Sequence, residues 1–359
     1  MPFRKDGRPN APRLADIARE AGVTRMAVSA VLLGTGKGKI RVSQETAERI
    51  QQIAKKINYR PNLAAQHLAG NRSGVIAIVA KNWKNYLTQS ALSWLHGAAE
   101  EKGFRVLTGQ ESNGIESVQH LIRDLQSGWI DGLVYLAYQN EAQWPEVAEL
   151  LGQISSPTVI AVGDLNIPGI PSVISDVAVG ATESMQHLIN RGRKRPILIT
   201  EEIDTPFIRT RLEAYQKVAV AAGITFTQDQ VIIAGLGWDF ADPDYYQRFD
   251  ELAASIRLGH NADAVLCDSD FTAAAILRAF RRLRVDVPED MSIIGWGDLQ
   301  FAGATDPMIT TVSYELMPLL SRAVNWLEKR IERSSDEGSG DDQSLVEYVA
   351  TRLVIRESS

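Results

Sequence analysis

The sequence predicts a small all-α unit of three short helices, followed by a larger α/β body whose two lobes are doubly wound parallel sheets. Three observations predict this fold. The first sixty residues place apolar side chains at helical spacing, the rest of the chain alternates short apolar runs with helical stretches, and 359 residues exceed one ordinary domain. Apolar residues make up 45% of the chain and charged residues 23%, which is typical of a folded protein.

The charge is divided unevenly along the chain. The first 73 residues hold 14 Lys and Arg against 5 Asp and Glu, whereas the remainder holds 24 against 39. A basic head on an acidic body is typical of a nucleic-acid-binding module attached to a domain that must not bind nucleic acid. A solvated basic face without a partner explains the charge alone equally well.

Two helices joined by a short turn are predicted at the start of the chain. The first has apolar residues at helical spacing, namely Leu14, Ile17, Ala18 and Ala21. Gly22 then tolerates the positive φ of a helix end, and Thr24 is a suitable N-cap for the second helix. The apolar face of that second helix carries Val28, Val31 and Leu32. This spacing predicts a helix-turn-helix, which holds its second helix out for the major groove of DNA.

A third helix is predicted after Ser43, which is a suitable N-cap. Its inner face carries Ala47, Ile50, Ala54 and Ile57, while its basic residues lie largely outside that face, namely Arg49, Lys55 and Lys56. The sequence therefore predicts three short helices that share one core. A generic three-helix bundle with another purpose remains an alternative on this spacing alone.

The run from Asn58 to Leu68, Asn-Tyr-Arg-Pro-Asn-Leu-Ala-Ala-Gln-His-Leu, makes the pattern more specific. Together with Leu-Ala-Asp-Ile-Ala at 14–18 and Ala-Gly-Val at 21–23, it resembles the headpiece and hinge of the LacI family of bacterial transcriptional regulators. The resemblance implies a hinge helix that forms in the DNA-bound dimer, with Leu68 wedged into the minor groove. Pro61 suits a first helical position, and an apolar wedge suits the bending of DNA. So short a helix is marginal alone, so it is expected only with a partner hinge and DNA.

The chain departs from the family in the second helix. Family members usually carry Thr-Val-Ser-Arg-Val-Leu-Asn where this chain has Ala-Val-Ser-Ala-Val-Leu-Leu at 27–33, so Ala30 replaces a base-reading arginine. Arg25 and Met26 occupy the variable recognition positions, and Arg25 is the candidate for bidentate contact with a guanine. The loop at 34–39 lacks the ending of a nucleotide-phosphate loop, and its lysines are expected to touch DNA phosphates. The predicted DNA-binding residues are Thr24, Arg25, Met26, Ser29, Ala30, Lys37, Lys39, Asn58, Tyr59, Arg60, Asn62, Ala65, Gln66 and Leu68.

Short apolar runs predict the strands of the body, at 75–80, 104–107, 130–136, 158–162, 196–200, 264–267 and 292–295. Their alternation with helical stretches predicts βαβ units in two lobes, with a ligand at the carboxyl ends of the strands. This body resembles the periplasmic-binding-protein-like effector domain of the same family. The matching segments are 131–134, 173–176 with Gly180, 211–215, 293–298 and 307–312.

The predicted domains are a headpiece at 1–60, a hinge helix and linker at 61–73, and an effector-binding and dimerisation domain at 74–359. By analogy with the family, lobe 1 comprises about 74–172 plus 307–333, and lobe 2 comprises about 173–306 plus 345–359. The segment 334–344 is rich in Ser, Gly and acidic residues and is expected to be an exposed loop.

Effector-binding residues follow from position only. Arg211 matches the arginine that in many relatives contacts sugar hydroxyls or a carboxylate, with a surface salt bridge as the alternative. The family's Asn-Asp appears as Ser269-Asp270, and its Gly-Phe/Tyr-Asp-Asp appears as Gly-Trp-Gly-Asp at 295–298, so two common ligand contacts are missing. Three tryptophans lie where a flat apolar face can stack on a sugar, with core packing as the alternative. The predicted effector-binding residues are Trp83, Arg211, Trp238, Ser269, Asp270, Trp296 and Asp298.

The sequence therefore predicts a cytoplasmic, homodimeric transcription regulator, expected to be a repressor, that binds a pseudopalindromic operator in double-stranded DNA. A small-molecule effector is expected to control it, with a sugar or sugar derivative as the favoured class. The alternative is an operator-binding regulator whose cleft binds a non-sugar effector or no ligand.

Other classes of protein find less support. The five histidines are scattered without metal-ligand spacing and no nucleophile elbow is present, so no enzyme, metal site or cofactor is expected. Cys267 is the single cysteine and has no internal partner for a disulfide. A solute-binding protein would need an export signal, and neither such a signal nor a membrane span is evident. An architectural DNA-binding protein with an unused cleft remains an alternative.

Overall fold

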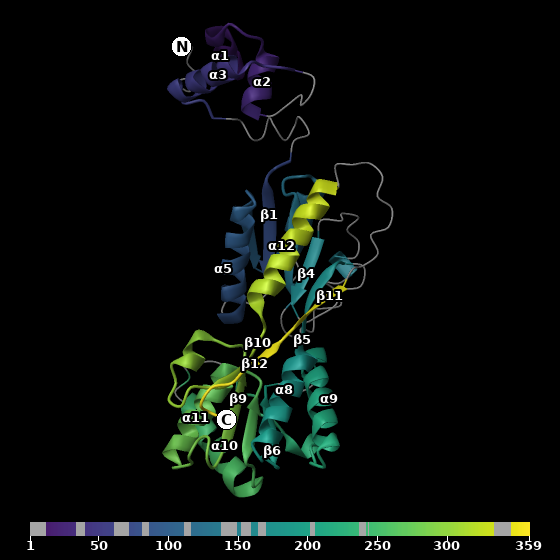
Figure 1. The fold of residues 1–359 in the computed structure, drawn as a ribbon, viewed down its shortest axis with the longest axis vertical. Helices are drawn as coiled ribbons and strands as arrows, with labels where there is room; N and C mark the ends of the chain where they lie inside the picture. The colour runs from purple at the N-terminus through teal and green to yellow at the C-terminus, as the bar shows by residue number, and fades with distance from the viewer. Residues whose placement is uncertain are drawn as a thin grey trace. The chain divides into compact units, whose positions relative to one another are not determined.

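The structure, a computed structural model, describes residues 12–33, 40–60, 72–80, 86–110, 116–137, 149–151, 159–163, 170–201, 205–236, 242, 244–333 and 346–359. The chain divides into two compact units, residues 1–73 and residues 74–359 (Figure 1). The first unit is helical and the second is α/β, so the predicted fold class is confirmed.

The first unit, here called the headpiece, contains three helices: α1 (Leu14–Ala21), α2 (Arg25–Leu33) and α3 (Gln44–Lys56). Gly22 ends α1 with a φ of 67°, the left-handed conformation that glycine adopts without a steric cost. Ser43 caps α3 by accepting a hydrogen bond from the Thr46 amide. The helices share one small core, formed by Ile17, Ala18, Ala21, Val28, Ile50, Ile53 and Ala54.

Lobe 1 of the body is a six-stranded parallel sheet in the order β11-β5-β4-β3-β1-β2. Its elements are β1 (Val75–Ala80), α5 (Tyr86–Glu101), β2 (Arg105–Gln110), α6 (Glu116–Gln126), β3 (Gly132–Ala137), β4 (Val159–Gly163), β5 (Ser172–Asp176), α12 (Leu316–Arg333) and β11 (Val346–Ala350). Alternate residues of β1 face opposite cores. Ile76 and Ile78 pack with α5 and α12, whereas Ala77 and Val79 pack with α6.

Lobe 2 is a second six-stranded sheet in the order β12-β10-β9-β8-β6-β7, parallel except for β12, which pairs antiparallel with β10. Its elements are α8 (Val177–Asn190), β6 (Pro196–Thr200), α9 (Pro206–Ala221), β7 (Val231–Ile233), α10 (Tyr245–Gly259), β8 (Ala264–Cys267), α11 (Asp270–Arg282), β9 (Ser292–Trp296), β10 (Thr310–Ser313) and β12 (Arg352–Val354), with short 3-10 turns at Gln228–Gln230 and Gln300–Gly303. One core packs α8 and α9 on the sheet, and another packs α10 and α11.

The lobe boundaries differ from the predicted ones by a few residues. Strand β5 was expected to open lobe 2, but it pairs with β4 in lobe 1. Strand β10 was expected in lobe 1 and β11 in lobe 2, yet β10 pairs with β9 and β11 pairs with β5. The sequence pattern predicts where a strand lies along the chain but not which neighbour it pairs with. The lobe to which β5, β10 and β11 belong is therefore known only from their pairing. The chain therefore changes lobes after Asp176, after Ser313 and at Thr351.

Candidate nucleic-acid interface and effector site

Helix α2 presents the predicted recognition residues at the surface of the headpiece. Thr24 caps the helix, because its Oγ1 accepts a hydrogen bond of 3.1 Å from the Ala27 amide. Arg25 is exposed, and Met26 has 66% of its surface exposed. Ser29 and Ala30 are half-buried one turn further on, while Val28 is buried in the headpiece core. Because Val28 faces the core, the side chains of Arg25 and Met26 point to the surface of the headpiece, where a binding partner can reach them.

The turn before α2 holds that helix against α1. The small residues Ala18 and Ala21 are buried, and Val23 packs against the shared core. The Val23 amide also donates a hydrogen bond of 3.0 Å to the Ala18 carbonyl, which closes the helix end. The turn is therefore the short, closely packed one that the spacing predicted, and it is typical of a helix-turn-helix.

Helix α3 is tied to α1 by an ion pair at its C-terminal end. Lys56 Nζ lies 2.9 Å from Glu20 Oε1, and the hydrogen bond from Lys56 to Glu20 raises the pKa of Lys56. After the helix, Asn58 has a φ of 52° and is exposed, as is Arg60. The left-handed conformation at Asn58 directs the chain back over the headpiece.

Tyr59 has a structural as well as a predicted DNA-binding role. Its ring packs on the headpiece core, and its amide donates a hydrogen bond of 2.8 Å to the Ala54 carbonyl. Burial raises the pKa of the Tyr59 hydroxyl, and the positive charge of Arg25 partly opposes that shift. Tyr59 therefore anchors the residues after α3 on the headpiece core.

Several predicted contact residues lie outside the described part of the chain. In the DNA-binding set these are Lys37, Lys39, Asn62, Ala65, Gln66 and Leu68. In the effector-binding set they are Trp83 and Trp238. The hinge helix expected within residues 61–73 likewise falls almost entirely outside the described residues, so these assignments stay predictions.

Arg211 projects from α9 into the interior of lobe 2 and is fully buried. Its guanidinium donates hydrogen bonds to the carbonyl of Cys267 at 2.9 Å and to the hydroxyl of Tyr215 at 3.3 Å. The central carbon of the guanidinium lies 3.7 Å from the centroid of a ring of Trp296, a cation–π arrangement. The alternative of a surface salt bridge is therefore wrong, because this side chain is inside the protein.

Three aromatic rings gather beside this arginine, at the carboxyl ends of β9 and β10. Phe207 meets Trp296 edge to face at a centroid distance of 5.7 Å, and Tyr314 lies 6.2 Å from Trp296. The Nε of Arg211 and the Nε1 of Trp296 are buried and have no hydrogen-bond partner among the described residues. Two buried donors therefore remain available next to an aromatic cluster, which is an unusual arrangement for a simple core.

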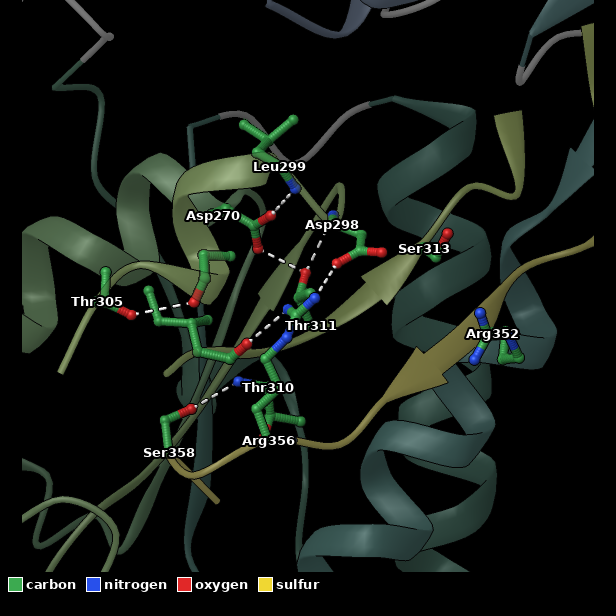
Figure 2. A network of polar contacts seen from close by, with 12 residues as sticks. Asp270, Asp298, Leu299, Thr305, Thr310, Thr311, Ser313, Arg352, Arg356 and Ser358 are labelled. Atoms are coloured by element: carbon green, nitrogen blue, oxygen red, sulfur yellow. Dashed lines mark hydrogen bonds and ion pairs between the residues drawn. The ribbon is translucent and has the colours of Figure 1, made fainter. Parts of the chain in front are cut away.

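Ser269, Asp270 and Asp298 hold the loops of lobe 2 together. Ser269 caps α11 by accepting a hydrogen bond of 3.1 Å from the Thr272 amide. Both oxygens of Asp270 are engaged: Oδ2 accepts from the Leu299 amide at 2.7 Å, and Oδ1 accepts from the Thr311 hydroxyl at 2.5 Å (Figure 2). Burial raises the pKa of Asp270 to about 6. Their predicted contact with an effector stays a prediction, because the visible partners lie within the lobe.

The last residues of the described chain join the same network (Figure 2). Arg356 donates a hydrogen bond of 2.6 Å to Asp298, whose φ is 51°, and its amide donates to Thr310 at 2.9 Å. Ser358 is fully buried and accepts a hydrogen bond of 2.9 Å from the Thr310 amide. This network fixes the loop after β9, and with it the position of Trp296.

Asp268 was not among the predicted site residues. This residue follows β8 directly, and its carboxylate accepts hydrogen bonds of 2.8 Å from the Thr272 hydroxyl and from the Glu201 amide. Burial raises the pKa of Asp268. The signal was present, because polar residues that follow a buried parallel strand lie at the edge where ligands bind.

Two kinds of feature are absent from the described residues. No group of three or more His, Cys, Asp or Glu side chains in that part of the chain is arranged to hold a metal ion. No helix in the described ranges is long and apolar enough to cross a membrane.

Comparison with known proteins agrees with this division of the chain. Residues 13–62 match "Bacterial regulatory proteins, lacI family", and residues 185–359 match "Periplasmic binding protein-like domain". Catabolite control protein A of Staphylococcus epidermidis (strain ATCC 12228 / FDA PCI 1200) is 26% identical over 314 residues, covering 88% of this chain and 91% of that protein.

Two solved structures have the same fold. The Lac repressor dimer bound to operator and the anti-inducer ONPF aligns with a TM-score of 0.75 at 20% identity, covering 97% of this chain and 99% of that one. The complex of the transcriptional regulator CelR with cellobiose aligns with a TM-score of 0.64 at 23% identity, covering 97% and 100%. The relatives named here are regulators of transcription and not enzymes. The chain therefore joins a DNA-binding domain of the lacI family to a periplasmic binding protein-like domain, and it is a DNA-binding regulator of transcription.

Proposed function

We propose that this regulator is a repressor that acts in the cytoplasm, where it binds a pseudopalindromic operator as a homodimer under the control of a small molecule. One observation carries the DNA-binding part of the proposal. The start of α2 exposes Arg25 and Met26 on a headpiece whose excess of Lys and Arg favours phosphate backbones. Arg25 reads a guanine in the major groove, and Thr24, Ser29 and Ala30 line the same groove.

The remaining contacts position the headpiece and the hinge. Exposed Asn58 and Arg60, together with Tyr59, Lys37 and Lys39, contact the phosphate backbone. Asn62, Ala65, Gln66 and Leu68 belong to the proposed hinge in the minor groove, as in the family. Two copies related by a two-fold axis then read two half-sites, and the Lac repressor has been solved as such a dimer on its operator.

The effector belongs at the carboxyl ends of the strands of lobe 2, beside Arg211 and Trp296. The Nε of Arg211 and the Nε1 of Trp296 are buried donors to which a hydroxyl-rich ligand can supply acceptors. Trp83 and Trp238 are the proposed stacking partners of a sugar ring, whereas Trp296 is buried with Arg211 over its ring and would contribute Nε1. A sugar or sugar derivative is therefore the proposed effector, and the related regulator CelR is known in complex with cellobiose.

A second candidate is a regulator with a non-sugar effector or with none. Both oxygens of Asp270 and one oxygen of Asp298 are used within the lobe, and the guanidinium of Arg211 already bonds to a backbone carbonyl. Because these groups are already hydrogen-bonded within the lobe, few of them are free to bond the hydroxyl groups of a sugar. This observation favours a ligand with more apolar surface.

The test selects bound sequences from randomised double-stranded DNA with the purified full chain, and then titrates the selected site with and without a panel of sugars. A palindromic site whose affinity falls in the presence of one sugar supports the whole proposal. A palindrome that no sugar affects supports the second candidate. The absence of any enriched site contradicts the assignment of an operator-binding repressor.

A further inference from the structure

The part of α2 that does not pack into the headpiece core carries two short rows of side chains, exposed at Arg25 and Met26 and half-buried one turn later. Residues four apart lie above one another on a helix, so Arg25 and Ser29 form one row and Met26 and Ala30 form the other. The first row is polar and the second is entirely apolar. The opposite side of the helix packs into the headpiece, because Val28 is buried and Val31 and Leu32 pack on the core.

Met26 is unusual among the described residues of the headpiece. It is the only large apolar side chain there with more than a third of its surface in water, at 66% exposed. Every other large apolar residue that the structure describes between 12 and 60 is buried or half-buried. An exposed thioether beside an exposed arginine, at the start of the helix that enters the groove, points to contact with an apolar group on a base.

Only one apolar group is offered by the bases in the major groove. Thymine carries a 5-methyl group there, whereas the other base edges present hydrogen-bond donors and acceptors. We propose that the row formed by Met26 and Ala30 reads thymine 5-methyl groups, next to the guanine that Arg25 contacts. This inference deepens the proposed operator binding and rests on it.

Dimensions limit how many bases this row can read. Four residues of α-helix advance by about 6 Å, and successive bases of one strand are about 3.4 Å apart. The row therefore spans one or two adjacent thymines in each half-site. Because a buried methyl group has a modest transfer free energy, each contact is expected to change affinity about fourfold.

The experiment uses DNA in which only the methyl group changes. The operator is first obtained by selection with the full chain, and each thymine is then replaced in turn by deoxyuridine, which lacks the 5-methyl group. Binding of wild-type protein is expected to weaken about fourfold at one or two adjacent positions in each half-site. When cytosine replaces thymine at those positions, the protein is expected to bind the duplex more tightly if the cytosine carries a 5-methyl group. The methyl group is then restored on a different base.

Variants of the protein assign the effect to Met26. M26A is expected to lose most of the sensitivity to deoxyuridine, with its salt dependence unchanged because no phosphate contact is removed. R25A is expected to lose discrimination of guanine while it keeps the methyl sensitivity. The matched control is M317A, since Met317 is also exposed, at 51%, but lies in α12 of lobe 1. M317A should bind every duplex as wild type does.

The outcomes separate this inference from the function on which it rests. No enriched site contradicts the proposed operator binding itself. An enriched site at which every thymine tolerates deoxyuridine overturns the methyl reading and leaves operator binding intact. Full methyl sensitivity in M26A overturns the assignment to Met26. The deoxyuridine scan with wild-type protein tests the methyl reading without any variant. A folding defect in M26A would therefore leave that test intact.

Discussion

At the scale of single residues, Asp270 is a buried carboxyl group whose charge depends on pH. Burial raises its pKa to about 6, while the hydrogen bonds from Thr311 and Leu299 favour the charged form. The folded protein therefore keeps this proton to a higher pH than the unfolded chain, in which an aspartate titrates near 4. Since the folded state binds more protons in this interval, the free energy of unfolding falls as the pH rises from about 4 to about 6.

The substitution D270N removes this titration. Relative to wild type, the free energy of unfolding of D270N is expected to increase by about 3 kcal/mol between pH 4 and pH 7, the amount set by a pKa difference of about two units. Urea unfolding at a series of pH values measures this difference. D290N is the matched control, because Asp290 is exposed and accepts a single hydrogen bond from the Asp286 amide. Parallel pH profiles for wild type and D270N would contradict the prediction.

Arg211 is held by the shape of its guanidinium as well as by its charge. A lysine at this position keeps the charge but loses the planar stack on Trp296 and leaves the Cys267 carbonyl or the Tyr215 hydroxyl without its donor. R211K is expected to lower the free energy of unfolding of the body by about 2–3 kcal/mol. Chemical unfolding followed by tryptophan fluorescence tests this, with R257K at an exposed position of α10 as the control. Equal unfolding midpoints for R211K and R257K would show that the stack contributes little.

At the scale of secondary-structure elements, the turn between α1 and α2 depends on Gly22. Its φ of 67° is costly for a residue with a Cβ, so G22A is expected to destabilise the headpiece by about 1 kcal/mol. Amide hydrogen exchange of α1 and α2 reports this local stability. G192A is the matched control, because Gly192 has a φ of 81° and an added Cβ there would have no neighbour within 4 Å, but it lies in lobe 2. Faster exchange in the headpiece is expected for G22A only, and unchanged exchange in G22A would contradict the prediction.

Elements that are buried on both faces were the most predictable. The runs at 75–80, 196–200 and 264–267 coincide with β1, β6 and β8, because a strand covered on both faces is apolar throughout. Strand β2 was expected at 104–107 but extends over Arg105–Gln110, because it lies at the edge of its sheet and is largely exposed and polar. The three-residue strand β7 was not predicted, since so short a segment carries no periodic pattern.

The candidate site was less predictable than the fold. Position alone predicted that Arg211 would lie near the ligand edge, but its partners are backbone carbonyls and an aromatic face that come from other elements. Such partners leave no pattern in the local sequence. Asp270 was predicted as a ligand contact from its position alone. Its hydrogen bonds with Leu299, after β9, and with Thr311, in β10, could not be predicted because they depend on which strands are neighbours in the sheet.

At the scale of the whole molecule, three crossings of the chain join the two lobes, and under the proposed function a change in lobe closure acts on them. Thr351, at the last crossing, donates through Oγ1 to the Asp176 carbonyl at 2.7 Å and accepts from the Gly180 amide at 2.9 Å. The first and last crossings are therefore joined by one side chain. A change in lobe closure is therefore expected to move these two crossings together.

Gly180 gives this junction its close packing. A Cβ at this position would lie 2.4 Å from a methyl carbon of Val312 and 2.7 Å from Thr351 Oγ1, so G180A must push α8 away from both. We expect a loss of about 1–3 kcal/mol in the stability of the body, seen as a melting temperature several degrees lower. Under the proposed function, G180A should also reduce the ratio of operator affinities measured with and without effector. G97A is the control, since Gly97 lies in α5, has no neighbour within 4 Å of an added Cβ, and should gain stability from alanine. If G180A melts like wild type and keeps the full response to effector, the junction is not the path by which the lobes control the headpiece.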